Sequence, residues 1–117
     1  MTNKEVIAAF YQEFFNDHVI EAAEKYVRED YIQHNPGVGQ GRQALMDAFA
    51  EKFKEHPEFN LQIKFMIEED DKVAVYLKNV DPQGNTRVRV VDIYRMQDGK
   101  LAEHWDVLQV VEADSMP

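Results

Sequence analysis

Two polar side chains near the C-terminal end of the chain, His104 and Asp106, have the types and the spacing for acid–base chemistry. Residues two apart on an extended strand point to the same face, so their Cα atoms would be about 6.5–7 Å apart. Their neighbours on that face are largely apolar, and a carboxylate among apolar groups is rare unless it is paired or functional. Asp106 is therefore a candidate general base or acid. The alternative is a structural Asp held by backbone N–H groups or by an arginine.

Other polar residues could join this pair. His104 could hydrogen-bond Asp106, orient a substrate carbonyl or relay a proton, or it could be a core histidine with satisfied ring nitrogens. Asp92 belongs to the preceding expected strand and faces the same way, so it could pair with either residue across the strands. His34 and Asn35 stand where a helical pattern breaks before a proline. Polar residues at such breaks either satisfy local backbone groups or reach into a site.

The pocket lined by these residues is expected to bind a small, largely apolar molecule, either as a substrate or as a ligand. Tyr31 and Tyr94 could line it or donate a hydroxyl group, although packing in the core is the simpler explanation for both. The full set of expected substrate contacts is Asn35, Tyr31, Tyr94, Val90, Leu108 and Phe49.

Metal and phosphate chemistry are not expected at this site. The side chains of His34, His104 and Asp106 form a set that can bind iron, but nothing in their spacing demands it. The glycines at positions 37, 39 and 41 do not follow a buried strand of a βαβ unit, so they do not predict a phosphate-binding loop. We therefore expect neither a metal ion nor a cofactor.

The composition of the chain limits its partners and location. With 117 residues, 44% of them hydrophobic and 11% aromatic, the chain is expected to form one domain, residues 1–117, with a packed core. A net charge of −9 would repel phosphate backbones and anionic membranes, so neither nucleic acid nor a membrane is an expected partner. The first residues lack the regions of a signal peptide and cysteine is absent, which favours a cytoplasmic location.

The N-terminal half shows the apolar period of helices. Thr2 followed by Glu5 is a capping box, which predicts a helix over residues 2–15. A second helix is expected to follow Asn16-Asp17, and a third covers about residues 42–56 before a proline. The expected buried positions are Val6, Ile7, Phe10 and Phe14 in the first helix, Ile20, Ala23 and Val27 in the second, and Leu45, Phe49 and Phe53 in the third.

From residue 61 onward the apolar period changes to two, as in strands. Four strands are expected, over residues 61–67, 72–80, 86–96 and 101–111. The glycine of the segment Gln97-Asp98-Gly99-Lys100 supplies the positive φ that a hairpin turn needs. Three helices followed by a four-stranded antiparallel meander predict an α+β fold with the helices on one face of the sheet. In the first strand the expected buried residues are Leu61, Ile63, Phe65 and Ile67.

Both faces of the last two strands carry large apolar residues, which a sheet with one face in water would not show. One face holds the candidate site residues among apolar side chains, as the wall of a pocket would. The other face centres on Trp105, with apolar neighbours and a charged rim, as at a subunit interface. We therefore predict a homodimer that packs sheet against sheet. The alternative is a monomer with a few exposed apolar residues.

Two separated segments of the chain are similar to one known family. They are Tyr31-Ile32-Gln33-His34-Asn35-Pro36 and the closing block with Asp92-Ile93-Tyr94-Arg95, Asp98-Gly99-Lys100 and Glu103-His104-Trp105-Asp106-Val107. With these motifs and the order of its elements, nearly the whole chain resembles the SnoaL-like branch of the nuclear transport factor 2-like superfamily.

The resemblance implies a fold and an activity. The implied fold is a cone-shaped α+β barrel, usually dimeric, in which N-terminal helices pack on a curved, mostly antiparallel sheet that encloses a pocket. The implied activity is polyketide cyclase chemistry, an intramolecular aldol condensation without metal or Schiff base, with an Asp of the last strand as acid and base. Asp106 matches that Asp by its place in the His104-Trp105-Asp106 motif, whereas Asp92 stands where the polyketide cyclases carry a histidine. Ketosteroid isomerase, several dehydratases and non-catalytic ligand binders share the fold, so the fold alone does not choose among activities.

The leading hypothesis is an enzyme that acts on a small carbonyl compound. Asp106 would remove a proton from the carbon next to the carbonyl, and His104 or His34 would stabilise the enolate oxygen. Aldol condensation or isomerisation would follow. The alternatives are a protein that only binds a small ligand, and a dehydratase or hydrolase that uses the Asp–His pair on water or a hydroxyl group.

Overall fold

The N-terminal segment is helical in the computed structural model of the chain, which describes residues 1–112. It forms α1 (Asn3–Phe10) and continues as a stretch of π-helix, η1 (Tyr11–Asn16). The predicted capping box is confirmed, because the Thr2 side chain accepts the N–H of Glu5 and the Glu5 carboxylate accepts the N–H of Thr2. The π-helical stretch adds buried rings to those that the sequence predicts. The buried aromatic residues of the segment are Phe10, Tyr11, Phe14 and Phe15.

The next segment differs from the prediction, because it contains a fifth strand. The second helix, α2 (Ala22–Tyr26), ends before Val27, which begins β1 (Val27–Gln33) and does not lie on a helix face as predicted. β1 pairs in parallel with β5 (Lys100–Val110), with Gln33 opposite His104. The run of charged residues at 28–30 and a shift in register hide the apolar alternation of this edge strand in the sequence.

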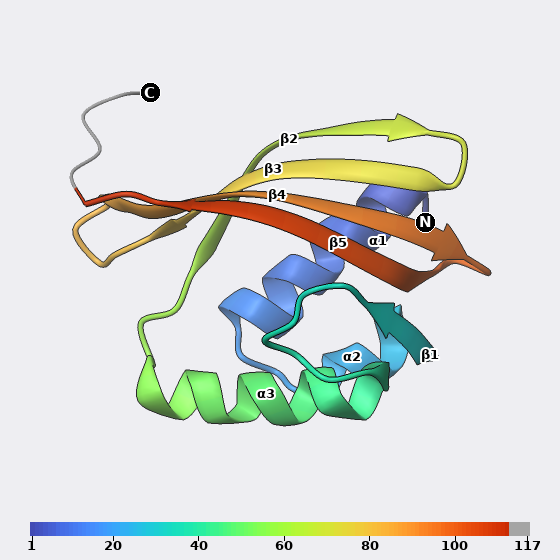
Figure 1. Ribbon diagram of the computed structural model, residues 1–117, viewed down its shortest axis with the longest axis horizontal. Coiled ribbons are helices and arrows are strands. Elements are labelled where there is room, and N and C mark those ends of the chain that lie inside the picture. Colours follow the sequence, from blue (N-terminus) through green and yellow to red (C-terminus); the bar gives the residue numbers. More distant parts are fainter. Residues whose placement is uncertain (113–117) are drawn as a thin grey trace.

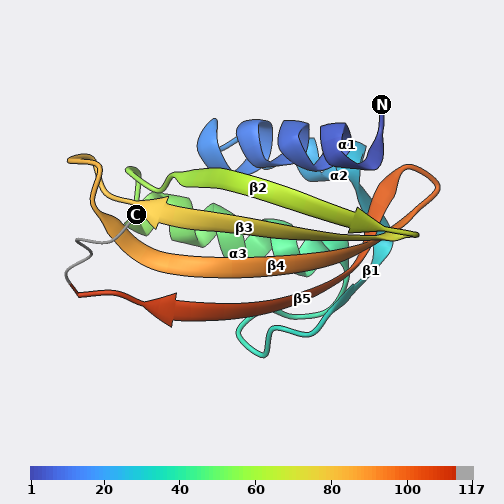
Figure 2. The same ribbon diagram turned by 90° about the horizontal axis from the view of Figure 1, so that it is seen from above.

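The five strands form one mixed sheet in the order β1-β5-β4-β3-β2. The predicted antiparallel meander is confirmed for β2 (Leu61–Glu69), β3 (Lys72–Val80), β4 (Thr86–Gln97) and β5. The helices lie on one side of the sheet, with α3 (Gly41–Glu55) along the bottom of Figure 1. Figure 2 shows how the strands curve as they pass over the helices. The edge strands β1 and β2 do not pair, so the sheet is open and does not close into a full barrel.

A β-bulge in β2 changes which of its side chains are buried. The register shifts by one residue between Ile63 and Phe65, and such a shift turns all following side chains to the opposite face. Beyond the shift Met66 packs against the core, whereas Phe65 and Ile67 are 55% and 63% exposed. The prediction that Phe65 and Ile67 share the buried face of Leu61 is therefore wrong.

The predicted hairpin between β4 and β5 is confirmed. Asp98 and Gly99 have φ angles of 54° and 75°, and two successive residues with positive φ are typical of the tight turn that suits twisted strands. The resulting register sets two pairs of residues directly opposite each other on the inner face of the sheet: Tyr94 with His104, and Asp92 with Asp106.

The third helix matches its prediction and completes the core. Leu45 and Phe53 of α3 are buried and Phe49 is half-buried, as expected for one apolar stripe. The Phe49 ring lies 5.6 Å from that of Phe14 and 5.1 Å from that of Phe15, centroid to centroid. These rings connect α3 with the N-terminal helical segment beneath the sheet. Within residues 1–112, no helix combines the length and the apolar character needed to cross a membrane.

Candidate active site

A cavity of about 150 Å³ lies between the inner face of the sheet and the helices. Most of its wall is aromatic or aliphatic, and its polar groups come from β1, the segment after it, α3, β4 and β5. The residues predicted from the sequence that line it are Asp106, His104, Asp92, Asn35, Tyr31, Tyr94, Val90, Leu108 and Phe49. The last strand thus directs its His and Asp into a mostly apolar pocket, as predicted, but this pocket is open at one end and not enclosed as the prediction had it.

The cavity is closed at one end and open at the other. Along β5 the exposed fraction rises from 7% at His104 to 53% at Leu108. Of the three α3 residues that line the cavity, Leu45 is buried, Phe49 is half-buried and Lys52 is exposed. Both elements run in the same direction, from right to left in Figure 1. His104 therefore lies at the inner end, and Leu108 and Lys52 lie at the mouth.

The ring of His104 is fixed by a partner at each nitrogen. Nδ1 lies 2.7 Å from Oε1 of Gln33, and that oxygen also accepts the backbone N–H of Asn35 at 3.0 Å. An atom that accepts a backbone N–H must be the amide oxygen, so Nδ1 carries a hydrogen and donates it. Nε2 lies 2.9 Å from Oδ1 of Asp92 and 3.8 Å from Oδ2 of Asp106. Nε2 and Asp92 consequently share one hydrogen, either as imidazolium and carboxylate or as neutral ring and carboxylic acid.

Two tyrosines complete the environment of Asp92. The Tyr11 hydroxyl donates to Oδ2 of Asp92, and it lies 2.7 Å from the hydroxyl of Tyr94. Since Tyr11 donates its one hydrogen to the carboxylate, Tyr94 is the donor between the two hydroxyls. Burial, and next the negative charge of Asp92, raise the pKa of both tyrosines well above its usual value. Both therefore remain hydrogen-bond donors at neutral pH.

Asp106 is held by a side-chain amide. Oδ1 of Asn35 accepts the backbone N–H of Gly37 at 2.8 Å, so the other end of the amide, Nδ2, is the group that donates to Oδ2 of Asp106 at 2.9 Å. Within the described part of the chain, neither an arginine nor a backbone N–H donates to this carboxylate. Its second oxygen has no donor there and is available to a substrate.

His34 does not reach the cavity. Its ring stacks on that of Trp105, with centroids 4.9 Å apart and planes at 4°, and its Nε2 lies 2.7 Å from Oε2 of Glu103, all on the outer side of the sheet. Alternate residues of an extended segment face opposite sides, and Gln33 takes the inward position. The sequence analysis missed Gln33, although the period of two that joins Tyr31, Gln33 and Asn35 would have indicated it.

Among the described residues, Asp92, His104 and Asp106 are the group that could hold a metal ion. One donor atom from each lies within 4.8 Å of the other two. In the observed arrangement, however, Nε2 of His104 and Oδ1 of Asp92 already satisfy each other through their shared hydrogen. The same geometry provides an acid–base pair, in which Asp106 can accept a proton and the Asp92–His104 pair can donate one.

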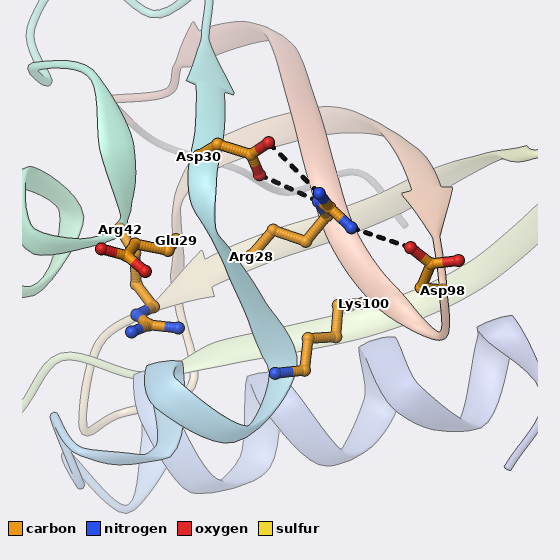
Figure 3. Close-up of a pocket in the computed structure, with 6 residues that line it drawn as sticks. All are labelled: Arg28, Glu29, Asp30, Arg42, Asp98 and Lys100. Atoms are coloured by element: carbon orange, nitrogen blue, oxygen red, sulfur yellow. Dashed lines mark hydrogen bonds and ion pairs between the residues drawn. The ribbon is translucent and has the colours of Figure 1, made fainter.

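A larger hollow of about 790 Å³ lies on the surface beside β1 and the turn between β4 and β5 (Figure 3). Arg28 binds Asp30 and Asp98 there, with N–O distances of 2.9 Å to each, and over the whole lining three basic residues balance three acidic ones. No residue of this hollow is a buried polar group. The smaller inner cavity, which has buried polar groups, is therefore the candidate site. The hollow is lined by Arg28, Glu29, Asp30, Arg42, Asp98 and Lys100.

Comparisons with known proteins agree with this architecture. A family model described as SnoaL-like polyketide cyclase matches residues 5–114. Wild-type IdmH, a proposed polyketide cyclase from Streptomyces antibioticus, is 19% identical, with 92% of each chain covered and a TM-score of 0.77. A proposed isomerase of the SnoaL-like family from Agrobacterium tumefaciens is 12% identical, with 93% of this chain and 99% of that chain covered and a TM-score of 0.78.

A proposed polyketide cyclase from Bacillus cereus is 24% identical, with 88% of this chain and 71% of that chain covered and a TM-score of 0.75. A search of curated protein sequences returns no significant match. At these identities, the similarity to solved structures shows the fold.

The contact between Gln33 and His104 predicts the protonation of the ring. The ¹⁵N chemical shifts of His104 should show a hydrogen on Nδ1. In Gln33→Leu this buried N–H loses its acceptor, which should lower the free energy of unfolding by about 1–3 kcal/mol and change the two ring shifts. Urea unfolding and ¹⁵N NMR measure both effects, with Gln43→Leu on exposed α3 surface as the control. A wild-type ring with no hydrogen on Nδ1 would contradict the assignment.

The raised pKa values predict alkaline unfolding. Burial raises the pKa of Tyr11, Tyr31 and Tyr94 above the ordinary value of 10.0. The unfolded chain therefore releases these protons first, so the stability they contribute is complete below pH 10 and is lost as the pH rises above it. Phenolate absorbance should show these three tyrosines ionising together with the loss of the circular dichroism signal. Reversible ionisation of these three in a folded chain would contradict this.

Proposed function

The chain belongs to the SnoaL-like polyketide cyclase family, and on that basis we propose that it is an enzyme that applies general acid–base catalysis to a small, largely apolar carbonyl compound. One observation carries the proposal: a single apolar cavity contains a carboxylate with an available oxygen, Asp106, beside the hydrogen-sharing pair Asp92–His104. A base and an acid that act on adjacent atoms of one substrate need this closeness.

The base is Asp106. Its available oxygen accepts a proton from the carbon next to the substrate carbonyl, while the amide of Asn35 holds the other oxygen and fixes the plane of the carboxylate. Because the Asn35 amide is itself fixed by the N–H of Gly37, it presents a donor to Asp106. A donated hydrogen bond stabilises the charged form of a carboxylate, which is the form that a base requires.

The acid is His104, acting together with Asp92. As the enolate forms, its oxygen gains negative charge and accepts the hydrogen that His104 and Asp92 share. The enolate carbon then either attacks a second carbonyl group, whose oxygen takes the proton that Asp106 accepted, as in an aldol condensation, or the enolate takes that proton from Asp106 at another carbon, as in an isomerisation. An Asp at position 92 suits this role, because its charge stabilises an imidazolium at His104, whereas a second histidine there would not.

The volume of the cavity limits the size of the substrate that fits inside it. Pockets for drug-sized ligands have volumes of about 300–1,000 Å³, and this cavity measures about 150 Å³. A compound with one ring or a short chain therefore fits the inner part. A substrate with several fused rings, such as a long polyketide, would extend beyond the mouth.

The chain also has a surface suited to a homodimer. On the outer face of the sheet, two rows of apolar residues cross four strands in register: Phe65, Tyr76, Val91 and Val107, and Ile67, Ala74, Ile93 and Trp105. Val107 is 74% exposed, and Phe65 and Ile67 are more than half exposed. The charged pair Arg95–Glu103 borders the rows. An apolar centre with a charged rim is the composition of a subunit interface, so this face packs against its copy in a second chain.

Replacing Asp106 with asparagine tests the base. Asp106→Asn keeps the size of the side chain and should leave the fold intact, while the rate should fall by about 10²–10⁴-fold. Exchange of the protons next to the carbonyl of small aryl ketones for deuterium, followed by NMR, measures the proton removal itself. Asp47→Asn on the exposed side of α3 is the control. Undiminished exchange in Asp106→Asn would refute the mechanism, and binding of ketones by the wild type without any exchange would favour the ligand-binding alternative.

Two valines of β5 test the dimer. Val107 and Val110 are 74% and 73% exposed, and they lie on opposite faces of the same strand. Val107→Asp should give a monomer in sedimentation equilibrium, because it places a charge at the centre of the interface, whereas Val110→Asp should leave a dimer. A wild-type chain that sediments as a monomer at micromolar concentration would rule the interface out.

A further inference from the structure

We propose that the substrate of the inner cavity carries a negatively charged group, such as a carboxylate, and that the ammonium group of Lys52 binds this group at the mouth. The proposal rests on the acid–base function proposed above and specifies the class of its substrate: a small apolar carbonyl compound with an anionic end. Lys52 then acts as the residue that determines specificity and orientation.

Lys52 occupies a distinct position in the cavity wall. Of the described residues that line the cavity, it is the one lysine or arginine. It lies on the same side of α3 as Leu45 and Phe49, about one helical turn beyond Phe49. The increase in exposure among these three residues puts it at the open end.

The ammonium of Lys52 lies over aromatic rings and, within residues 1–112, has no anionic partner. It lies 5.3 Å from the ring centroid of Phe59 and 5.8 Å from that of Phe49. No carboxylate among residues 1–112 lies within ion-pair distance of it. This is notable in a chain with 22 acidic residues and only 13 lysines and arginines. The ring faces orient the ammonium group and leave its hydrogens for another acceptor.

The acidic groups nearest to the mouth are already engaged. A shallow hollow of about 170 Å³ on the other side of Lys52 contains Glu58 and Asp81. Glu58 lies 3.4 Å from Nδ1 of His56, and Asp81 accepts the N–H groups of Gln83 and Asn85 at 3.0 and 2.8 Å. They form local contacts of their own, and the charge of Lys52 is left to face the cavity mouth.

The distribution of charge gives a bound molecule one orientation. Two carboxyl groups, those of Asp92 and Asp106, lie toward the inner end, where an anion would be repelled. The cation lies at the mouth. A substrate with an anionic end therefore enters with its apolar carbonyl part first, which brings the carbonyl to His104 and keeps the charge in partial contact with water. The alternative is a solvated lysine whose stem covers the phenylalanine rings, and it predicts no preference for anions.

Two probes of equal shape distinguish a Lys52 that binds anions from a Lys52 that is only solvated. Binding of 3-phenylpropanoate and of the neutral 3-phenylpropanamide would be measured by calorimetry on the full chain. The acid should bind about two- to fivefold more tightly than the amide, which is the range that exposed ion pairs give, and added salt should reduce the difference. In Lys52→Met, which keeps the stem on the rings and removes the charge, the preference should disappear. Lys54→Met, on the same helix but outside the cavity, should retain it.

Equal binding of acid and amide by the wild type would overturn the proposal, as would a preference that survives in Lys52→Met or a failure of the acid to bind at all. None of these results depends on catalytic turnover, so none of them would contradict the role of Asp106 as the base. Conversely, undiminished deuterium exchange in Asp106→Asn would refute the acid–base function without changing the preference measured by calorimetry. The two proposals can therefore fail separately.

Discussion

The fixed ring of His104 is the interaction on which the rest of the structure depends. Its two nitrogens connect Gln33 of β1 with Asp92 of β4, and Asp92 is in turn bound by Tyr11 of the helical segment. A buried polar group without a partner is costly, so each member of this chain of hydrogen bonds requires the next. The network joins an edge strand, two inner strands and the first helical segment around one histidine. The fold and the alignment of His104 with Asp92 therefore depend on the same hydrogen bonds.

The sequence predicts the parts of this site that follow from a regular period. The alternation along β5 places His104 and Asp106 on one face, and the glycine turn before it predicts the hairpin that brings Asp92 opposite Asp106. The sequence does not predict where the period is interrupted. The bulge after Ile63 depends on how β2 meets β3, and the parallel pairing of β1 is a long-range contact that no local pattern of residues encodes.

The sequence analysis placed His34 in the site, whereas the structure places Gln33 there, and the cause is again the pairing of β1 with β5. The residue types alone favour a histidine for chemistry, and the charged run at 28–30 hides the period of two that would mark the chain there as a strand. Once β1 pairs with β5, however, the register of this pairing decides which face of the sheet each side chain points to. His34 then belongs with Trp105 on the outer face, and the inward amide of Gln33 sets the tautomer of His104. An amide with no charge of its own decides which nitrogen is free to act.

The bulge in β2 also has an evolutionary consequence. Without that one extra residue, Phe65 and Ile67 would turn inward toward the core, and the outer face would lose half of the apolar residues that β2 and β3 supply to it. A deletion of a single residue near position 64 would therefore overfill the core and reduce the apolar surface of the outer face in one step. Substitutions can change β2 one side chain at a time, whereas a change in its length turns all following side chains to the opposite face at once. In aligned relatives, we expect insertions and deletions to avoid β2 and to accumulate in the turns.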